Sequence, residues 1–97
     1  MLVLGNQGIG MPNALIKWTS LGGQWDKRSM WLLELTTEGL EFPPKPKALE
    51  VICKFAPHTD IVQHNGRSLQ VMLPVSAEET TRASIGLELG QLISVAA

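Results

Sequence analysis

Four side chains that can ligate a metal ion or carry a proton lie within twelve positions of one another: Cys53, His58, Asp60 and His64. A cysteine beside a histidine can act as a nucleophilic dyad, and the same residue types are the ligands that zinc prefers. Their spacing matches neither of the zinc-ligand patterns C-x2-C and H-x3-H. If Asp60 and His64 share a strand, they stand about 13 Å apart, which is too far for one ion. We therefore predict no metal, no cofactor and no catalytic residue.

Other polar and aromatic side chains indicate binding instead of catalysis. Trp25 lies in a polar segment beside Lys27 and Arg28. An exposed tryptophan among charged residues is typical of an interface hot spot. A small-molecule pocket between sheet and helix would draw its polar groups from His58, Asp60 or Arg67. The candidate binding residues are Trp25, Lys27, Arg28, His58, Asp60 and Arg67.

The segment Asp26-Lys27-Arg28, followed by Leu35-Thr36-Thr37-Glu38-Gly39, resembles the wing of MarR-type winged-helix repressors. In that family a D-x-R strand runs into an L-T-x-x-G helix start, and the resemblance implies DNA binding through Lys27 and Arg28. A winged helix also needs a helix-turn-helix before its wing, whereas residues 1–25 contain glycine breaks and no helix pair. The net charge of −1 provides no basic surface for phosphates. DNA binding therefore ranks last, and we expect no nucleic-acid partner.

Alternation of apolar and polar residues predicts strands along most of the chain. Residues 48–55 show the clearest period of two, with Val51 and Cys53 on the apolar side, as in a half-buried strand. Residues 14–20 and 30–36 are also predicted as strands, because each combines tryptophan with a run of alternating or continuous apolar positions. Residues 42–47 hold three prolines, which favour extended backbone, so we expect a crossing loop there.

Asn65-Gly66 suits a two-residue hairpin turn, because both residues reach positive φ at low cost. The turn predicts strands over 61–64 and 67–73, with His64 opposite Arg67.

A capping box, formed by Ser76 and Glu79, marks the start of a predicted helix over residues 77–93. Gly86 and Gly90 disfavour a long helix, so a short helix followed by a final strand is the alternative. At the other end of the chain, we expect a short strand over residues 1–4 and a glycine-rich loop over 5–12.

These elements define a single α+β domain over residues 1–97, with a small antiparallel sheet of about five strands and one C-terminal helix. A compact β-barrel is the alternative. Apolar residues make up 44% of the chain and charged residues 18%, against about 25% charged in typical soluble domains. A small domain has little interior in which to place that apolar excess, so we predict a homodimer, with Gly86 and Gly90 allowing close approach of two helices.

The remaining expectations concern location and function. No apolar stretch approaches the ~20 residues of a membrane span, and a single cysteine suits a reducing compartment, so we expect a cytoplasmic protein without membrane contact. The sequence favours a non-enzymatic binding or interaction module whose partner is a second copy or another protein. A small-molecule-binding or minimal enzymatic domain, with a pocket between sheet and helix, is the alternative.

Overall fold

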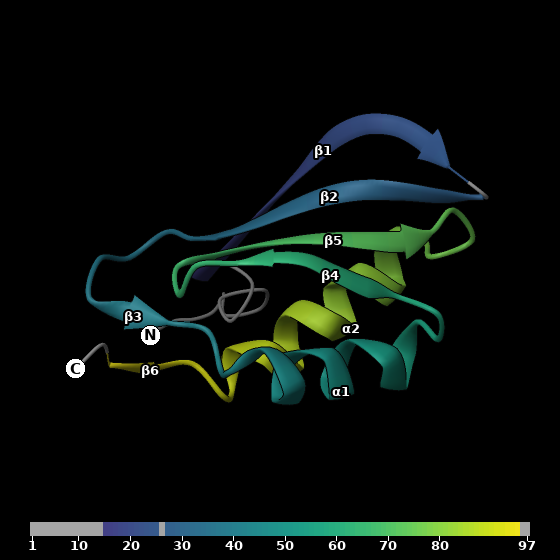
Figure 1. Ribbon diagram of the computed structural model, residues 1–97. Coiled ribbons are helices and arrows are strands. Elements are labelled where there is room, and N and C mark those ends of the chain that lie inside the picture. Colours follow the sequence, from purple (N-terminus) through teal and green to yellow (C-terminus); the bar gives the residue numbers. More distant parts are fainter. Residues whose placement is uncertain (1–14, 26, 96–97) are drawn as a thin grey trace, which may run out of the picture.

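The computed structural model describes residues 15–25 and 27–95. The elements in chain order are β1 (Ile16–Trp25), β2 (Arg28–Leu35), β3 (Leu40–Glu41), α1 (Lys45–Phe55), β4 (Asp60–His64), β5 (Ser68–Pro74), α2 (Glu79–Gly90) and β6 (Ser94–Val95). Four strands form an antiparallel sheet in the order β1-β2-β5-β4, and β3 pairs with β6 in a separate ribbon (Figure 1). The α+β class is confirmed. The described sheet is open at both edges, so the β-barrel alternative is wrong.

The core lies between one face of the sheet and the two helices, which pack side by side (Figure 1). Alternate residues of the central strands are buried on this face, including Leu33 in β2 and Val71 in β5. Helix α2 adds Ile85 and Leu89, which are fully buried. Each such side chain stabilises the fold by about 1.5–3 kcal/mol relative to an exposed one.

The predicted strand over residues 48–55 is wrong, because this segment is helix α1. Its buried residues are Ala48, Val51 and Ile52, which follow the i, i+3, i+4 spacing of a helical face. Pro44 is the N-cap and Pro46 lies in the first turn, where a proline removes no helical hydrogen bond. The predicted extended loop therefore ends at Pro44 instead of reaching residue 47.

The predicted hairpin is present, but its register differs from the prediction. His64 pairs with Leu69 instead of Arg67, and three residues, 65–67, connect β4 to β5. The side-chain Oδ1 of Asn65 accepts hydrogen bonds from the backbone N–H and the hydroxyl of Ser68, at 2.9 and 2.7 Å, and these bonds hold the wider loop. A bulge at Val62 compensates within β4 and leaves that side chain 52% exposed.

Helix α2 is shorter at both ends than the predicted 77–93. Its N-cap is Glu78 and no side chain caps it, so the Ser76 capping box is wrong; Ser76 lies in a turn in which Ala77 N–H donates to the Pro74 carbonyl at 2.9 Å. The helix stops at Gly90 and β6 follows, as in the alternative of a short helix and a final strand.

Strands β1 and β2 occupy both segments predicted as early strands. β1 continues to Trp25 through register shifts at two glycines, Gly22 and Gly23, whose φ values are 77° and 76°. After β2, Gly39 adopts φ 82° in a turn where the winged-helix resemblance implied a helix start, so that implication is wrong. The strand predicted over residues 1–4 and the loop over 5–12 lie outside the described residues.

Candidate functional site

Two of the loops that carry predicted binding residues meet at one end of the sheet. The β1–β2 connection brings Lys27 and the α1–β4 loop brings His58, and both border a surface depression of about 540 Å³. The turn after β5 completes the rim. The lining residues are Lys27, Arg28, His58, Pro74, Val75 and Ser76. Three of the six predicted binding residues therefore share one surface feature.

The two turns at this depression are joined through the backbone. The N–H of Val75 donates to the carbonyl of Lys27 at 2.8 Å, and Arg28 pairs with Pro74 across the β2–β5 ladder. Lys27 has φ 61°, in the left-handed region that non-glycine residues adopt rarely. Such a conformation persists only where the surrounding structure holds it. The backbone that presents Lys27 is thus held by the neighbouring turn.

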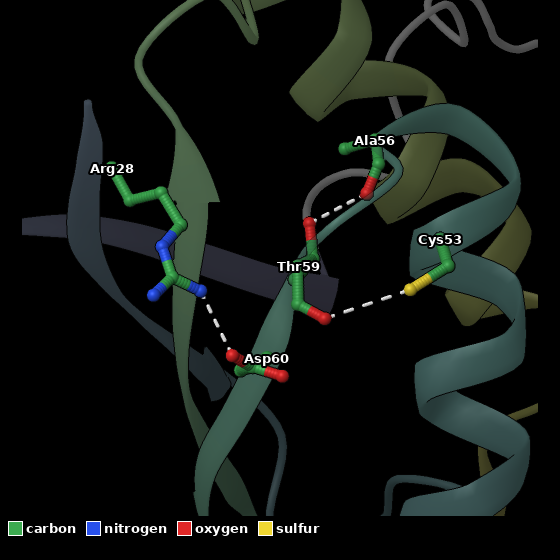
Figure 2. Close-up of polar contacts among 5 residues, drawn as sticks. All are labelled: Arg28, Cys53, Ala56, Thr59 and Asp60. Carbon is green, nitrogen blue, oxygen red and sulfur yellow. Dashed lines mark hydrogen bonds and ion pairs between the residues drawn. The ribbon is translucent and has the colours of Figure 1, made fainter. Parts of the chain in front are cut away.

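His58 comes from a loop that is held just as firmly. It also has a left-handed backbone, with φ 71°. Directly after it, buried Thr59 donates its hydroxyl hydrogen to the carbonyl of Ala56 at 2.7 Å. The thiol of Cys53 donates to the carbonyl of Thr59 at 3.6 Å, which ties the loop back to α1 (Figure 2). Cys53 is half-buried, its thiol helps to hold the α1–β4 loop, and it does not line the depression.

Asp60 contacts the depression through Arg28. Its Oδ2 accepts a hydrogen bond from Arg28 Nη1 at 2.8 Å, and the pair reaches across β5, since β5 lies between β2 and β4. Figure 2 shows Asp60 turned toward Arg28 and away from α1. Both side chains are partly or largely exposed, and exposed pairs of this kind contribute about 0–1 kcal/mol to stability. The main consequence of the ion pair is therefore that it fixes the position of the Arg28 guanidinium beside the depression.

The other two predicted binding residues do not join this group. Arg67 lies at the opposite end of β5, where its Nη2 donates to the carbonyls of Leu35 and Thr37 at 3.4 and 3.3 Å. Trp25 ends β1 and its backbone pairs with Arg28. The hot-spot prediction concerns the Trp25 side chain, which lies outside what the structure describes.

The sequence suggested His58, Asp60 or Arg67 as the polar groups of a pocket between sheet and helix. Among the described residues, His58 lines both the depression above and a second one of about 350 Å³ that also includes Phe55, Pro74 and Thr81.

A groove that the sequence gave no signal for lies between the sheet and α2. Trp18 and Trp31 meet edge to face, with ring centroids 6.0 Å apart, and the guanidinium of Arg82 lies 4.3 Å from the Trp31 ring. Arg82 also donates to the carbonyl of Ala77 at 2.9 Å. Trp18 and Trp31 both pack against the core, and Arg82 comes from α2, which tertiary packing brings beside them. This cation–π contact closes one end of the core beside α2.

The face of the sheet opposite the helices carries apolar side chains at its centre. Met30 of β2 pairs with Met72 of β5, and Leu32 lies one step along the same face. All three are half-buried, and no described element covers them. An antiparallel sheet with one face toward the core normally has polar residues on the other. This open face, defined by Met30, Leu32 and Met72, is therefore unusual.

Within residues 15–25 and 27–95, no three His, Cys, Asp or Glu side chains are grouped as metal ligands. His64 has its own contacts: Gly66 N–H donates to Nδ1 at 3.2 Å, so Nε2 carries the hydrogen that reaches the Pro43 carbonyl at 2.9 Å. None of the helices described is both long and apolar enough to span a bilayer.

Comparison with known proteins adds no relative. No family model, curated protein or solved structure matches this chain.

Proposed function

We propose that this protein is a non-enzymatic interaction module that forms a two-fold homodimer through the open face of its sheet. The observation that carries the proposal is the Met30–Met72 pair, with Leu32 beside it, on a face that no described element covers. Apolar side chains gathered at the centre of an exposed surface are typical of protein–protein contacts.

A two-fold contact requires that one patch be complementary to itself. Met30 and Met72 suit this requirement, because unbranched thioether side chains adapt to one another across a symmetry axis. Polar and charged groups border the patch, including Gln70 opposite Leu32 and the Arg28–Asp60 pair at one end. An apolar centre with a polar rim is the usual anatomy of such an interface.

The area of the open face limits the affinity of the proposed dimer. Four strands about 4.8 Å apart, with an average length of about seven residues, cover a face of roughly 19 by 23 Å. That footprint is about 440 Å² for each protomer, or about 900 Å² for both, which is below the roughly 1,200–2,000 Å² of stable interfaces. The dimer should therefore be weak, with a dissociation constant in the micromolar range or above.

The proposal includes a cytoplasmic location, which rests on the free thiol of Cys53. A further protein partner would then act on a surface outside the dimer contact.

Sedimentation velocity over a range of concentrations tests the dimer. The sedimentation coefficient of the unaltered protein should rise with concentration, while Leu32→Glu should stay monomeric, because its charge would be buried without a partner. Leu87→Glu is the matched control, since Leu87 is 44% exposed on α2 and away from the open face. Circular dichroism should show that both variants are folded.

A concentration-independent monomer would overturn the proposal. Equal loss of self-association in Leu32→Glu and Leu87→Glu would overturn the assignment to this face.

A further inference from the structure

We infer that the depression bordered by Lys27, Arg28 and His58 binds a phosphate monoester group. This site adjoins the Met30–Leu32–Met72 contact at Arg28, but the inference rests on Lys27, His58 and Ser76 as well and does not depend on the proposed dimer. Lys27 and Arg28 alone gave no reason to expect such a site. The new observation is that the fold adds His58 and Ser76 to the same depression.

The depression gathers hydrogen-bond donors that nothing in the described chain uses. The ammonium group of Lys27, the imidazole of His58 and the hydroxyl of Ser76 have no hydrogen-bond or ion-pair partner among the described residues. Arg28 uses Nη1 for Asp60, and a guanidinium has further N–H groups to donate. Donors on separate rims of one depression can approach a single ligand from different directions.

This arrangement suits a tetrahedral anion better than a planar one. A phosphate group presents several strong acceptor oxygens in different directions, whereas a carboxylate presents two oxygens in one plane. Lysine and arginine are the residues that bind phosphate most often, the first as a point charge and the second through its fork of donors. Lys27 and Arg28 together carry two positive charges, of which Asp60 offsets one.

The backbone holds these donors before any ligand arrives. The hydrogen bond from Val75 N–H to the Lys27 carbonyl and the bond from Thr59 to Ala56 fix the loops on either side. Both Lys27 and His58 keep left-handed backbone conformations, which cost free energy and cluster at functional sites. A site that is already ordered loses less entropy when it binds.

The depression has room for a ligand larger than a free phosphate ion. The depression measures about 540 Å³, within the roughly 300–1,000 Å³ range of small-molecule sites. Pro74 and Val75 give it an apolar wall. The wall would contact an organic group attached to the phosphate.

The test is an amide-resolved NMR titration with inorganic phosphate at constant ionic strength, with chloride as the reference anion. Saturable shifts are expected at the amides of Lys27, His58 and Val75. Lys27→Ala should weaken binding about tenfold, the usual effect of losing one charge-assisted hydrogen bond. Lys45→Ala, which removes an exposed lysine at the start of α1, should leave it unchanged.

The substitution Asp60→Asn distinguishes phosphate binding at Arg28 from a purely structural role of the Arg28–Asp60 contact. It removes the negative charge beside Arg28 and keeps an oxygen that can accept the same hydrogen bond. Phosphate should then bind a few-fold more tightly, since repulsion between like charges is lost. Leu32→Glu should bind phosphate as the unaltered protein does, which separates this inference from the proposed dimer.

Two further probes identify the source of the phosphate. Adenosine monophosphate represents a small phosphorylated metabolite, and blocked phosphoserine represents a phosphorylated protein. The probe that binds more tightly indicates which class of molecule carries the phosphate group. The inference is overturned if phosphate causes no saturable shift, if Lys45→Ala weakens binding as much as Lys27→Ala, or if Asp60→Asn weakens it.

Discussion

The segment that folds differently from its prediction, residues 48–55, allows a matched pair of substitutions. In helix α1, Ile52 is fully buried, whereas Leu49 is half-buried. In the predicted strand, Leu49 would face the core and Ile52 the solvent. Ile52→Ala and Leu49→Ala each remove three carbon atoms, so the chemistry is equal and only the burial differs.

The expected costs follow from that burial. Removing three buried carbons from Ile52 loses about 2.4 kcal/mol of transfer free energy, and the cavity left behind raises the total to about 3–4 kcal/mol. Leu49 is only half removed from water and solvent can refill its space, so its truncation should cost about 1 kcal/mol. Urea denaturation followed by tryptophan fluorescence measures both values. At a slope of about 1 kcal/mol per molar urea, the midpoints should fall by about 3 M and 1 M.

A protein of this size has limited stability, so Ile52→Ala could unfold it entirely. Ile52→Val then provides a measurable value of about 1 kcal/mol. If Leu49→Ala costs as much as Ile52→Ala or more, the helical account of this segment is refuted.

Three further substitutions test contacts elsewhere. Thr59→Val removes the hydroxyl that donates to the buried Ala56 carbonyl, and should cost about 1–3 kcal/mol in urea denaturation; an unchanged midpoint would contradict the contact. Gly39→Ala should cost about 1 kcal/mol through its φ of 82° alone, because an added Cβ meets no atom within 4 Å, and a neutral result would argue against that backbone. The hydrogen bond from Lys47 to Glu50, together with the lysine charge, lowers the pKa of the Glu50 carboxyl. The stability from this pair should therefore be present above the ordinary carboxyl pKa and fade as pH falls through the lowered value, and carboxyl NMR titration should find the pKa back near its ordinary value in Lys47→Met.

The strands of the main sheet could be predicted because their residues alternate or are continuously apolar. Helix α1 could not be recognised so simply, since Val51 belongs to both an alternating set and a helical set. The helical set Ala48, Val51 and Ile52 was present in the sequence. Pro46 made a helix look unfavourable, although its place in the first turn carries no penalty.

The register of the hairpin depended on a detail that turn statistics do not contain. Asn65-Gly66 favours a two-residue turn, but the Asn65 side chain accepts hydrogen bonds from Ser68, and the connection contains three residues. The bulge at Val62 interrupts the alternation in β4 and lets buried Ile61 pair with Val71.

The candidate site was predicted residue by residue but not as a group. Lys27 and His58 were each named because they lie in loops. Their meeting depends on the pairing of Arg28 with Pro74 and on the turn that follows β5, which are tertiary features. The contact between Arg82 and Trp31 was not predicted either, because it joins α2 to the sheet and depends on tertiary packing.

The central claim, that two copies meet through the open face, is tested most directly by an isotope-filtered NMR experiment. One sample is labelled at the methionine methyl groups and mixed with unlabelled protein, so that only contacts between protomers are detected. The account predicts intermolecular contacts from the methyls of Met30 and Met72, which lie side by side at the centre of the face. Intermolecular contacts that leave out both methyls, in a sample that self-associates, would contradict it.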